Sequence, residues 1–217
     1  MKKLAIFDMD GTLLNTLEDL AHSCNHTLAQ FGYPLHDTQQ YKTFVGNGAR
    51  KLVERMLPAE SRSPDRIEEV LAAYRAYYAQ HSTDCTKPYP GIEQALRELR
   101  QAGVKLGIVS NKPHSDTVQL AALYFGEKTF DLVYGAMEGV PVKPDPAAVQ
   151  KMMAAVGVSP AETAYFGDSG VDMLTGKAAG TWTVGVLWGF RTKEELEESG
   201  ADSTIAKPEE IVGQVLN

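Results

Sequence analysis

Residues 3–12 read Lys-Leu-Ala-Ile-Phe-Asp-Met-Asp-Gly-Thr, an apolar run that ends in two carboxylates, a glycine and a hydroxyl. The run from Leu4 to Phe7 is too short for a helix and is closed by turn-forming residues, which is typical of a buried strand in a parallel sheet. Asp8 and Asp10 would then lie at the carboxyl end of that strand, where open α/β sheets bind their ligands. An Asp-Gly turn between two strands would explain the glycine and one carboxylate, but it gives no reason for the second carboxylate.

Two carboxylates two residues apart can divide the work of catalysis. One of them, ionised, can act as a nucleophile and as a metal ligand. The like charge favours a proton on its neighbour, which can then act as a general acid and base. Asp8 and Asp10 are therefore the first candidate catalytic residues.

Three later motifs follow in chain order, two of them directly after short apolar runs that predict strands. They are Ser110-Asn111 after residues 104–109, Val142-Lys143-Pro144, and Gly167-Asp168-Ser169-Gly170-Val171-Asp172 after residues 163–166. Each motif alone has an ordinary interpretation as an N-cap, a surface lysine or a helix-dipole contact. Together with the first motif, in this order, they resemble the four signatures of the haloacid dehalogenase superfamily of phosphotransferases.

The resemblance implies a role for each motif. Asp8 is the expected nucleophile, Asp10 the expected general acid and base, and Lys143 the cation that neutralises the nucleophile and the transferring phosphate. The expected phosphate and substrate contacts in these motifs are Thr12, Ser110, Asn111 and Lys143. The expected cofactor is Mg²⁺, because a site made of oxygen ligands suits this ion. Its expected ligands are Asp8, the backbone carbonyl of Asp10, Asp168 and Asp172, the last as a direct ligand or as a neighbour of the ligands.

The alternation of strands and helices is interrupted once, by a helical stretch after the first strand. Helical spacing runs from Thr16 to Gly32, and Thr16 with Asp19 predicts a capping box at its start. Further helical segments are expected after Asp37, from Gly48, and from Ser63. Beyond the turn-rich residues 86–91, we expect helices at 92–102, 114–125, 146–156, 170–179 and from Pro208, and strands at 104–109, 131–134, 163–166 and 182–187.

This layout predicts an α/β protein with a Rossmann-like parallel sheet core flanked by helices and an inserted α-helical cap domain. The core is assigned to residues 1–14 and 87–217, and the cap to residues 15–86. By resemblance, it is the arrangement of the capped subgroup that includes phosphoglycolate phosphatases, sugar-phosphate mutases and pyrophosphatases. A cap can exclude water and contact the part of the substrate that is not phosphate.

The predicted cap contains one loop with a substrate-binding pattern, Phe-Val-Gly-Asn-Gly-Ala-Arg at residues 44–50, which resembles the loop of phosphoglycolate phosphatases. Gly48 lies at an expected helix N-terminus, which attracts anions, and Arg50 could bind a carboxylate in a bidentate manner. Arg50 is equally compatible with a solvated helix face. His22 and His26, one turn apart, could bind a metal in principle, but without a third ligand they are better explained as partly exposed residues.

Composition limits the classes of partner. The 217-residue chain has a net charge of -7, which argues against a nucleic acid or an anionic membrane surface as partner. Its two cysteines, Cys24 and Cys85, show neither a disulfide framework nor a metal-ligand spacing, which suits the cytoplasm. The amino terminus does not resemble a secretory signal. We expect a small phosphorylated metabolite as the partner, and a monomer and a homodimer both stay open.

We therefore expect a Mg²⁺-dependent phosphatase that hydrolyses a small phosphate monoester through an aspartyl-phosphate, with 2-phosphoglycolate as one candidate substrate. The alternatives within the superfamily are a sugar-phosphate mutase and an inorganic pyrophosphatase. A non-enzymatic phospho-receiver domain uses a similar set of residues, but it needs neither Asp10 as an acid and base nor a helical cap.

Overall fold

The computed structural model describes all residues, 1–217. The chain divides into two compact units. Unit 1 consists of Met1–Leu14 together with Pro88–Asn217, and unit 2 of Asn15–Lys87. The two passages of the chain between the units run through two short paired strands, β2 (Leu14–Asn15) and β3 (Lys87–Pro88).

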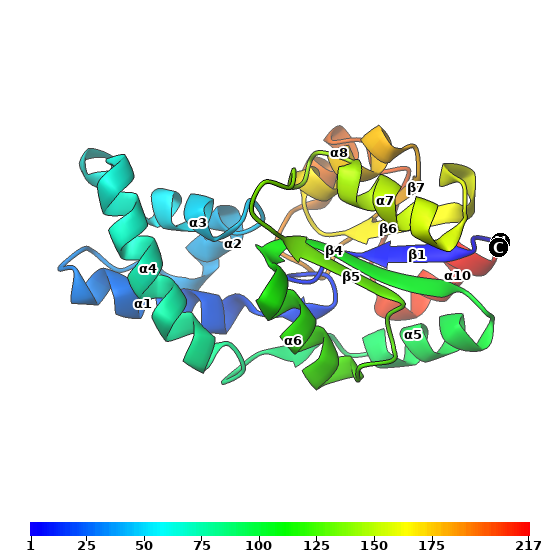
Figure 1. Cartoon of the computed structure of the whole chain (residues 1–217), viewed down its shortest axis with the longest axis horizontal. Coiled ribbons are helices and arrows are strands. Elements are labelled where there is room, and N and C mark those ends of the chain that lie inside the picture. The colour runs from blue at the N-terminus through cyan, green and yellow to red at the C-terminus, as the bar shows by residue number, and fades with distance from the viewer. The chain divides into compact units, whose positions relative to one another are not determined.

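Unit 1 is built on a six-stranded sheet in the order β5-β4-β1-β6-β7-β8 (Figure 1). Every paired register is parallel, which confirms the predicted parallel α/β sheet. The strands are β1 (Leu4–Phe7), β4 (Lys105–Pro113), β5 (Leu132–Ala136), β6 (Thr163–Gly167), β7 (Trp182–Val186) and β8 (Ser203–Ile205). Because β1 lies between β4 and β6, three of the four sequence motifs follow neighbouring strands.

Helices cover both faces of the sheet, with α7 and α8 on one side and α5, α6 and α10 on the other (Figure 1). Their bounds are α5 (Ile92–Gln101), α6 (His114–Phe125), α7 (Ala147–Val156), α8 (Gly170–Ala179) and α10 (Ile211–Leu216). Side chains along β1 alternate between the two cores. Leu4 and Ile6 pack with Met152 of α7, whereas Ala5 and Phe7 pack on the other face. This two-sided burial explains why the strand is uniformly apolar.

Several elements of unit 1 differ from those predicted. β4 continues beyond residue 109 to Pro113, with a shift in its register against β5. The segment after residue 187 contains a short helix, α9 (Lys193–Glu198), and the edge strand β8, neither of which was predicted. Both elements are too short for the spacing of their apolar residues to indicate a helix or a strand. A short 3₁₀ helix, Pro160–Glu162, precedes β6, and another, Pro208–Glu210, precedes α10.

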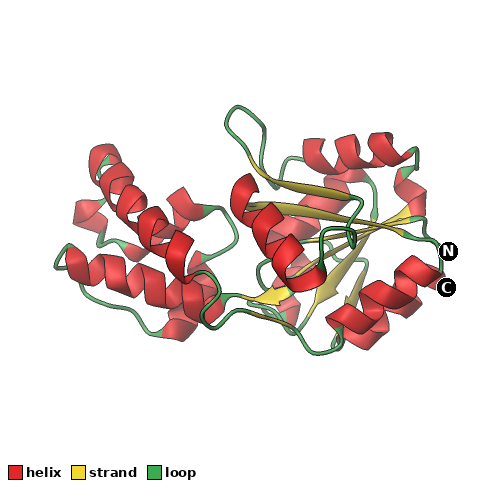
Figure 2. Ribbon diagram, turned by 60° about the horizontal axis from the view of Figure 1, so that its bottom comes forward, coloured by secondary structure: helices red, strands yellow, loops and turns green.

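Unit 2 is helical (Figure 2). It contains α1 (Leu17–Gln30), α2 (Tyr41–Phe44), α3 (Ala49–Met56) and α4 (Pro64–His81), with 3₁₀ turns at Thr38–Gln40 and Ala59–Ser61. The interpretation of Thr16 and Asp19 as a capping box was wrong, because Thr16 makes no side-chain cap bond. The Asp19 carboxylate instead accepts hydrogen bonds from Cys85 and Thr86. These partners are remote in sequence, so a local pattern does not reveal them.

No helix is both long enough and apolar enough to cross a lipid bilayer.

The central strands should carry much of the stability of unit 1. Leu106 on β4 is fully buried, so Leu106→Ala should lower the free energy of unfolding by about 2–5 kcal/mol through lost burial and a residual cavity. Leu123 on α6 is 59% exposed, and Leu123→Ala is the matched control, with an expected change within about 0.5 kcal/mol. Urea denaturation followed by circular dichroism measures both. Equal losses in the two variants would contradict this packing.

Candidate active site

A tight loop at the end of β1 presents the first two carboxylates. The backbone N–H groups of Leu13 and Leu14 both donate to the carbonyl of Met9, at 3.0 Å. Gly11 has a φ of 85°, in the left-handed region, and a Cβ atom there would collide with the carboxylate of Asp168. Position 11 therefore requires glycine, because the Asp168 carboxylate of the last motif lies too close for any side chain there.

Lys143 lies between two buried carboxylates. Its Nζ is 2.9 Å from Oδ1 of Asp8 and 2.7 Å from Oδ1 of Asp172, and its side chain is 2% exposed. Burial alone would lower the pKa of Lys143, but Asp172 and Asp8 outweigh it and hold the pKa well above its ordinary value. Lys143 therefore stays a cation and offsets part of the negative charge at the site.

Asn111 fixes the backbone of Lys143. Its amide nitrogen donates to the Lys143 carbonyl at 3.0 Å, and its Oδ1 accepts from the Lys143 N–H at 2.9 Å. From its motif, Asn111 is predicted to contact substrate. In the structure, its side chain bridges the end of β4 to the loop that carries Lys143. The neighbouring Ser110 is also buried, and its hydroxyl accepts a hydrogen bond from the Lys112 N–H at 3.3 Å.

Asp172 uses both of its oxygens in hydrogen bonds. Oδ1 accepts from Lys143 Nζ and from the Tyr165 hydroxyl at 3.2 Å, and Oδ2 accepts from the N–H and the hydroxyl of Ser169. This carboxylate is fully buried and caps the start of α8. Each oxygen therefore already has two partners, which leaves little capacity for a metal ion.

Asp168 is oriented by a loop that the sequence analysis did not identify. Its Oδ2 accepts from the N–H of Phe190 at 2.8 Å, and its Oδ1 accepts from the Thr12 hydroxyl at 3.3 Å. The indole of Trp188 donates to the Thr12 carbonyl at 2.9 Å. A Cβ at Gly189 would collide with Asp168, so the loop can pass this close only with glycine. In the sequence, the only indication of this loop is Trp188-Gly189-Phe190, a glycine between two aromatic residues directly after a predicted strand.

A second buried lysine, Lys112, was also missed. Its Nζ lies 3.2 and 3.3 Å from the two oxygens of Asp10, and its side chain is 3% exposed. From the sequence, the strand is expected to end at residue 109 and the next helix to begin at residue 114, so residues 110–113 would belong to neither. They belong to β4, and the strand carries Lys112 into the site. Lys112 lies three residues beyond the last apolar residue of the run, Val109, so the sequence pattern does not indicate its place in the site.

The buried carboxylates fit a divalent cation. Oxygens of Asp8, Asp168 and Asp172 all lie within 4.8 Å of one another. Oδ1 of Asp8 is buried and accepts no hydrogen bond, its contact being the ion pair with Lys143. Burial raises the pKa of Asp8 to about 6, with Lys143 opposing the shift and Asp172 adding to it. Burial, Asp172 and Asp8 likewise raise the pKa of Asp168 well above its usual range. Because Asp172 is engaged by Lys143, Tyr165 and Ser169, the carboxylates available to an ion are Asp8 and Asp168, and such oxygen donors suit Mg²⁺.

The cap residues named from the sequence lie within unit 2. Gly48 has a φ of 83° and is the N-cap of α3. Arg50 is 52% exposed at its side chain and pairs with Glu68 on α4, with Nε 2.8 Å from Oε1. His26 stacks on Tyr77 with ring centroids 3.8 Å apart. Both His22 and His26 are exposed, in line with their interpretation as solvent-facing residues of the cap.

The chain is similar in sequence to known hydrolases. The family model described as haloacid dehalogenase-like hydrolase matches residues 5–186. A phosphoglycolate phosphatase of Haemophilus influenzae is 31% identical over 206 residues, covering 92% of each protein. One of Aquifex aeolicus is 31% identical over 210 residues, covering 97% of this chain and 95% of that protein.

The fold is similar as well. A crystal structure from Lactobacillus delbrueckii, described as a candidate phosphoglycolate phosphatase, superposes with a TM-score of 0.93 at 32% identity and covers 99% of both chains. The four motifs, the parallel sheet and these matches agree. The protein belongs to the haloacid dehalogenase-like hydrolase family, and the resemblance stated from its sequence is confirmed.

The raised pKa of Asp8 gives an expected pH dependence. Folding raises this pKa from 3.8 to about 6, so protonated Asp8 is favoured in the folded state. In the metal-free protein, the contribution of Asp8 to the free energy of unfolding is therefore largest at low pH and is lost as the pH rises from about 4 to about 6. A bound cation reverses this effect, because it requires the ionised form. Mg²⁺ affinity should therefore fall as the pH drops through about 6, by about tenfold per pH unit for the proton on Asp8 and more steeply where Asp168 is protonated as well.

Titration calorimetry with Mg²⁺ at about pH 5 and about pH 7.5 measures this dependence. Asp131→Asn, which removes a carboxylate paired with Lys105 away from the site, is the control and should leave the dependence unchanged. Equal affinity at both pH values would contradict a cation site on these carboxylates.

Proposed function

We propose that this protein is a Mg²⁺-dependent phosphatase that hydrolyses small phosphate monoesters through an aspartyl-phosphate on Asp8, with 2-phosphoglycolate as a candidate substrate. The single observation that carries the proposal is the arrangement around Asp8. A buried carboxylate lies at the end of the central strand, with an ammonium group at 2.9 Å and two further carboxylates near it. Two relatives are named phosphoglycolate phosphatases, which supports a small phosphate monoester as the substrate class.

In the proposed reaction, one oxygen of Asp8 attacks phosphorus and forms a P–O bond while the bond to the leaving oxygen breaks. Asp10 gives that oxygen a proton. Asp10 then takes a proton from water, which attacks the aspartyl-phosphate, releases phosphate and regenerates Asp8. Lys143 and the Ser110 hydroxyl are the proposed contacts of the phosphate oxygens, because both lie buried beside Asp8 or at the adjacent strand end.

Mg²⁺ would be held by Asp8, Asp168 and the backbone carbonyl of Asp10, and it would supply charge neutralisation of the phosphate oxygens. Asp172 is proposed as a positioning residue, because its four hydrogen bonds direct Lys143 toward Asp8. Asn111 is also proposed as a positioning residue, because its side chain forms hydrogen bonds with the backbone of Lys143. Lys112 positions Asp10 in the ligand-free state.

The two carboxylates of the first motif should be separable by experiment. Asp8→Asn keeps the shape of the side chain but cannot attack phosphorus, so turnover of both 2-phosphoglycolate and p-nitrophenyl phosphate should be lost. Asp10→Asn should lose roughly 10²- to 10⁴-fold on 2-phosphoglycolate, which is typical of general acid–base catalysis.

The loss in Asp10→Asn should shrink on p-nitrophenyl phosphate, whose leaving group needs little protonation. Steady-state assays with saturating Mg²⁺ measure all four rates. Normal turnover by Asp8→Asn, or equal losses in Asp10→Asn on both esters, would contradict the roles proposed.

The proposed role of Lys112 in positioning Asp10 can be distinguished from a purely structural role by comparing two substrates. Lys112→Met keeps much of the buried side chain but removes the cation that holds Asp10. We expect a lower kcat that is more pronounced on 2-phosphoglycolate than on p-nitrophenyl phosphate, as in Asp10→Asn. Lys112→Arg should recover part of the rate because it restores the charge. An equal decrease on both esters would assign Lys112 to general stability instead.

Arg50 tests the substrate assignment. The exposed pair with Glu68 is weak and can be exchanged for a substrate carboxylate. If Arg50 binds the carboxylate of 2-phosphoglycolate, Arg50→Ala should lose about 1.5–3 kcal/mol, or about 10- to 150-fold in kcat/KM. Activity on p-nitrophenyl phosphate, which has no carboxylate, should change little.

The matched control for Arg50 is Lys51→Ala. Lys51 is the next residue on α3 and pairs with Glu54, so both esters should be hydrolysed normally. Equal losses on both esters in Arg50→Ala, or none, would remove the carboxylate contact from the proposal and leave an unspecified phosphate ester as substrate.

A further inference from the structure

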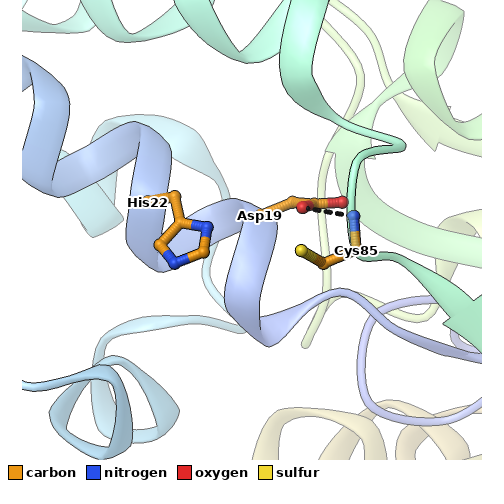
Figure 3. Close-up of side chains that lie close together, drawn as sticks. All are labelled: Asp19, His22 and Cys85. Carbon is orange, nitrogen blue, oxygen red and sulfur yellow. Dashed lines mark hydrogen bonds between the residues drawn. The ribbon is translucent and has the colours of Figure 1, made fainter.

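Unit 2 contains a second cluster of metal-ligating side chains, separate from the carboxylates of unit 1. Asp19 and His22 lie one turn apart on α1, and Cys85 follows α4 near the end of the unit (Figure 3). One potential ligand atom from each of the three residues lies within 4.8 Å of the others. Figure 3 shows the Cys85 side chain extending toward the His22 ring, next to the Asp19 carboxylate.

The backbone of residues 85 and 86 is fixed on Asp19. Oδ1 of Asp19 accepts from the Cys85 N–H at 2.8 Å, whereas Oδ2 accepts from both the N–H and the hydroxyl of Thr86, at 2.8 and 2.6 Å. Each carboxylate oxygen has two lone pairs. Oδ2 is thus fully used by Thr86, whereas Oδ1 has one backbone donor, and the Cys85 thiol also interacts with this carboxylate.

The Cys85 thiol itself lies against two carboxylates, because it interacts with the side chains of Glu18 and Asp19. Both histidines of α1 are exposed to solvent, and the ring of His26 is stacked on Tyr77. Partial burial raises the pKa of the Cys85 thiol, and so do the neighbouring Asp19 and Glu18 carboxylates. A thiol, an imidazole and a carboxylate oxygen are together the donor set of a borderline-soft ion and not of Mg²⁺.

We propose that Asp19, His22 and Cys85 form a Zn²⁺ site, with three protein ligands and a fourth position open to water. On binding, the S–H bond of Cys85 breaks, a sulfur–zinc bond forms and the proton passes to water. Ligand atoms around tetrahedral zinc are about 3.5 Å apart. The exposed His22 side chain can close the remaining distance by rotation about its side-chain bonds.

The location gives the site a structural consequence. Asp19 and Cys85 lie close in sequence to Asn15 and Lys87, where unit 2 begins and ends. A bound ion would therefore cross-link the first turn of α1 to the segment that leaves the unit. The proposal is independent of the phosphatase function, because none of its residues takes part in the proposed chemistry.

Cobalt(II) is the probe for this site, since it replaces zinc and produces a near-ultraviolet charge-transfer band only when bound to a thiolate. The reduced full-length protein is titrated with Co²⁺ in excess Mg²⁺, which occupies the carboxylates of unit 1. We expect one equivalent of thiolate-bound Co²⁺, displaced by Zn²⁺. Cys85→Ser should abolish the band, and His22→Ala should abolish or strongly weaken it.

His26→Ala and Cys24→Ala are the matched controls and should retain the band, since His26 stacks on Tyr77 and Cys24 is fully buried in the core. Zn²⁺ should also protect Cys85 from alkylation by iodoacetamide in the parent protein but not in His22→Ala. A parent protein without the band, a band retained in Cys85→Ser, or full zinc protection in His22→Ala would each overturn the proposal.

Discussion

The ion pair between Lys143 and Asp8 is the contact on which the rest of the site depends. Burying carboxylates is costly unless a cation lies close to them. Here the Lys143 ammonium lies 2.9 Å from Asp8 and 2.7 Å from Asp172, and Asn111 holds its backbone in place. Burial is the main cause that raises the pKa of Asp8 to about 6 and the pKa of Asp168 well above its usual range, and the neighbouring carboxylates add to it. A divalent cation bound to these carboxylates would favour their ionised forms.

The order of the strands explains how distant motifs meet. Parallel strands bring their carboxyl ends to one edge of a sheet, and β4, β1 and β6 are neighbours. Asp8, Ser110 and Asp168 consequently come together from widely separated parts of the chain. Close approach then demands glycine at Gly11 and Gly189, where any side chain would collide with Asp168. The fold thus constrains the identity of residues that do no chemistry themselves.

The sequence predicted the elements with strong periodicity, and α6 and α8 begin and end at the predicted residues. It did not predict what depends on contacts remote in sequence. Lys112 meets Asp10 only because β4 continues past its apolar part, and the loop at Trp188 meets Asp168 only once β7 lies beside β6. The carboxylate of Asp19 fits a capping box by spacing, yet its partners lie after α4. A local sequence pattern indicates which partners a side chain could have, but the hydrogen bonds between distant parts of the chain determine which partner it has.

The phosphorylated form of Asp8 offers the most direct measurement of the proposed chemistry. The protein is mixed with Mg²⁺ and excess p-nitrophenyl phosphate, quenched in acid within the first turnovers, digested, and analysed by mass spectrometry. The expected result is one phosphate on the peptide that carries Asp8, at the Asp8 carboxyl group, and none in Asp8→Asn. Phosphate on a different residue, or turnover with no phosphorylated peptide at any quench time, would contradict Asp8 as the nucleophile.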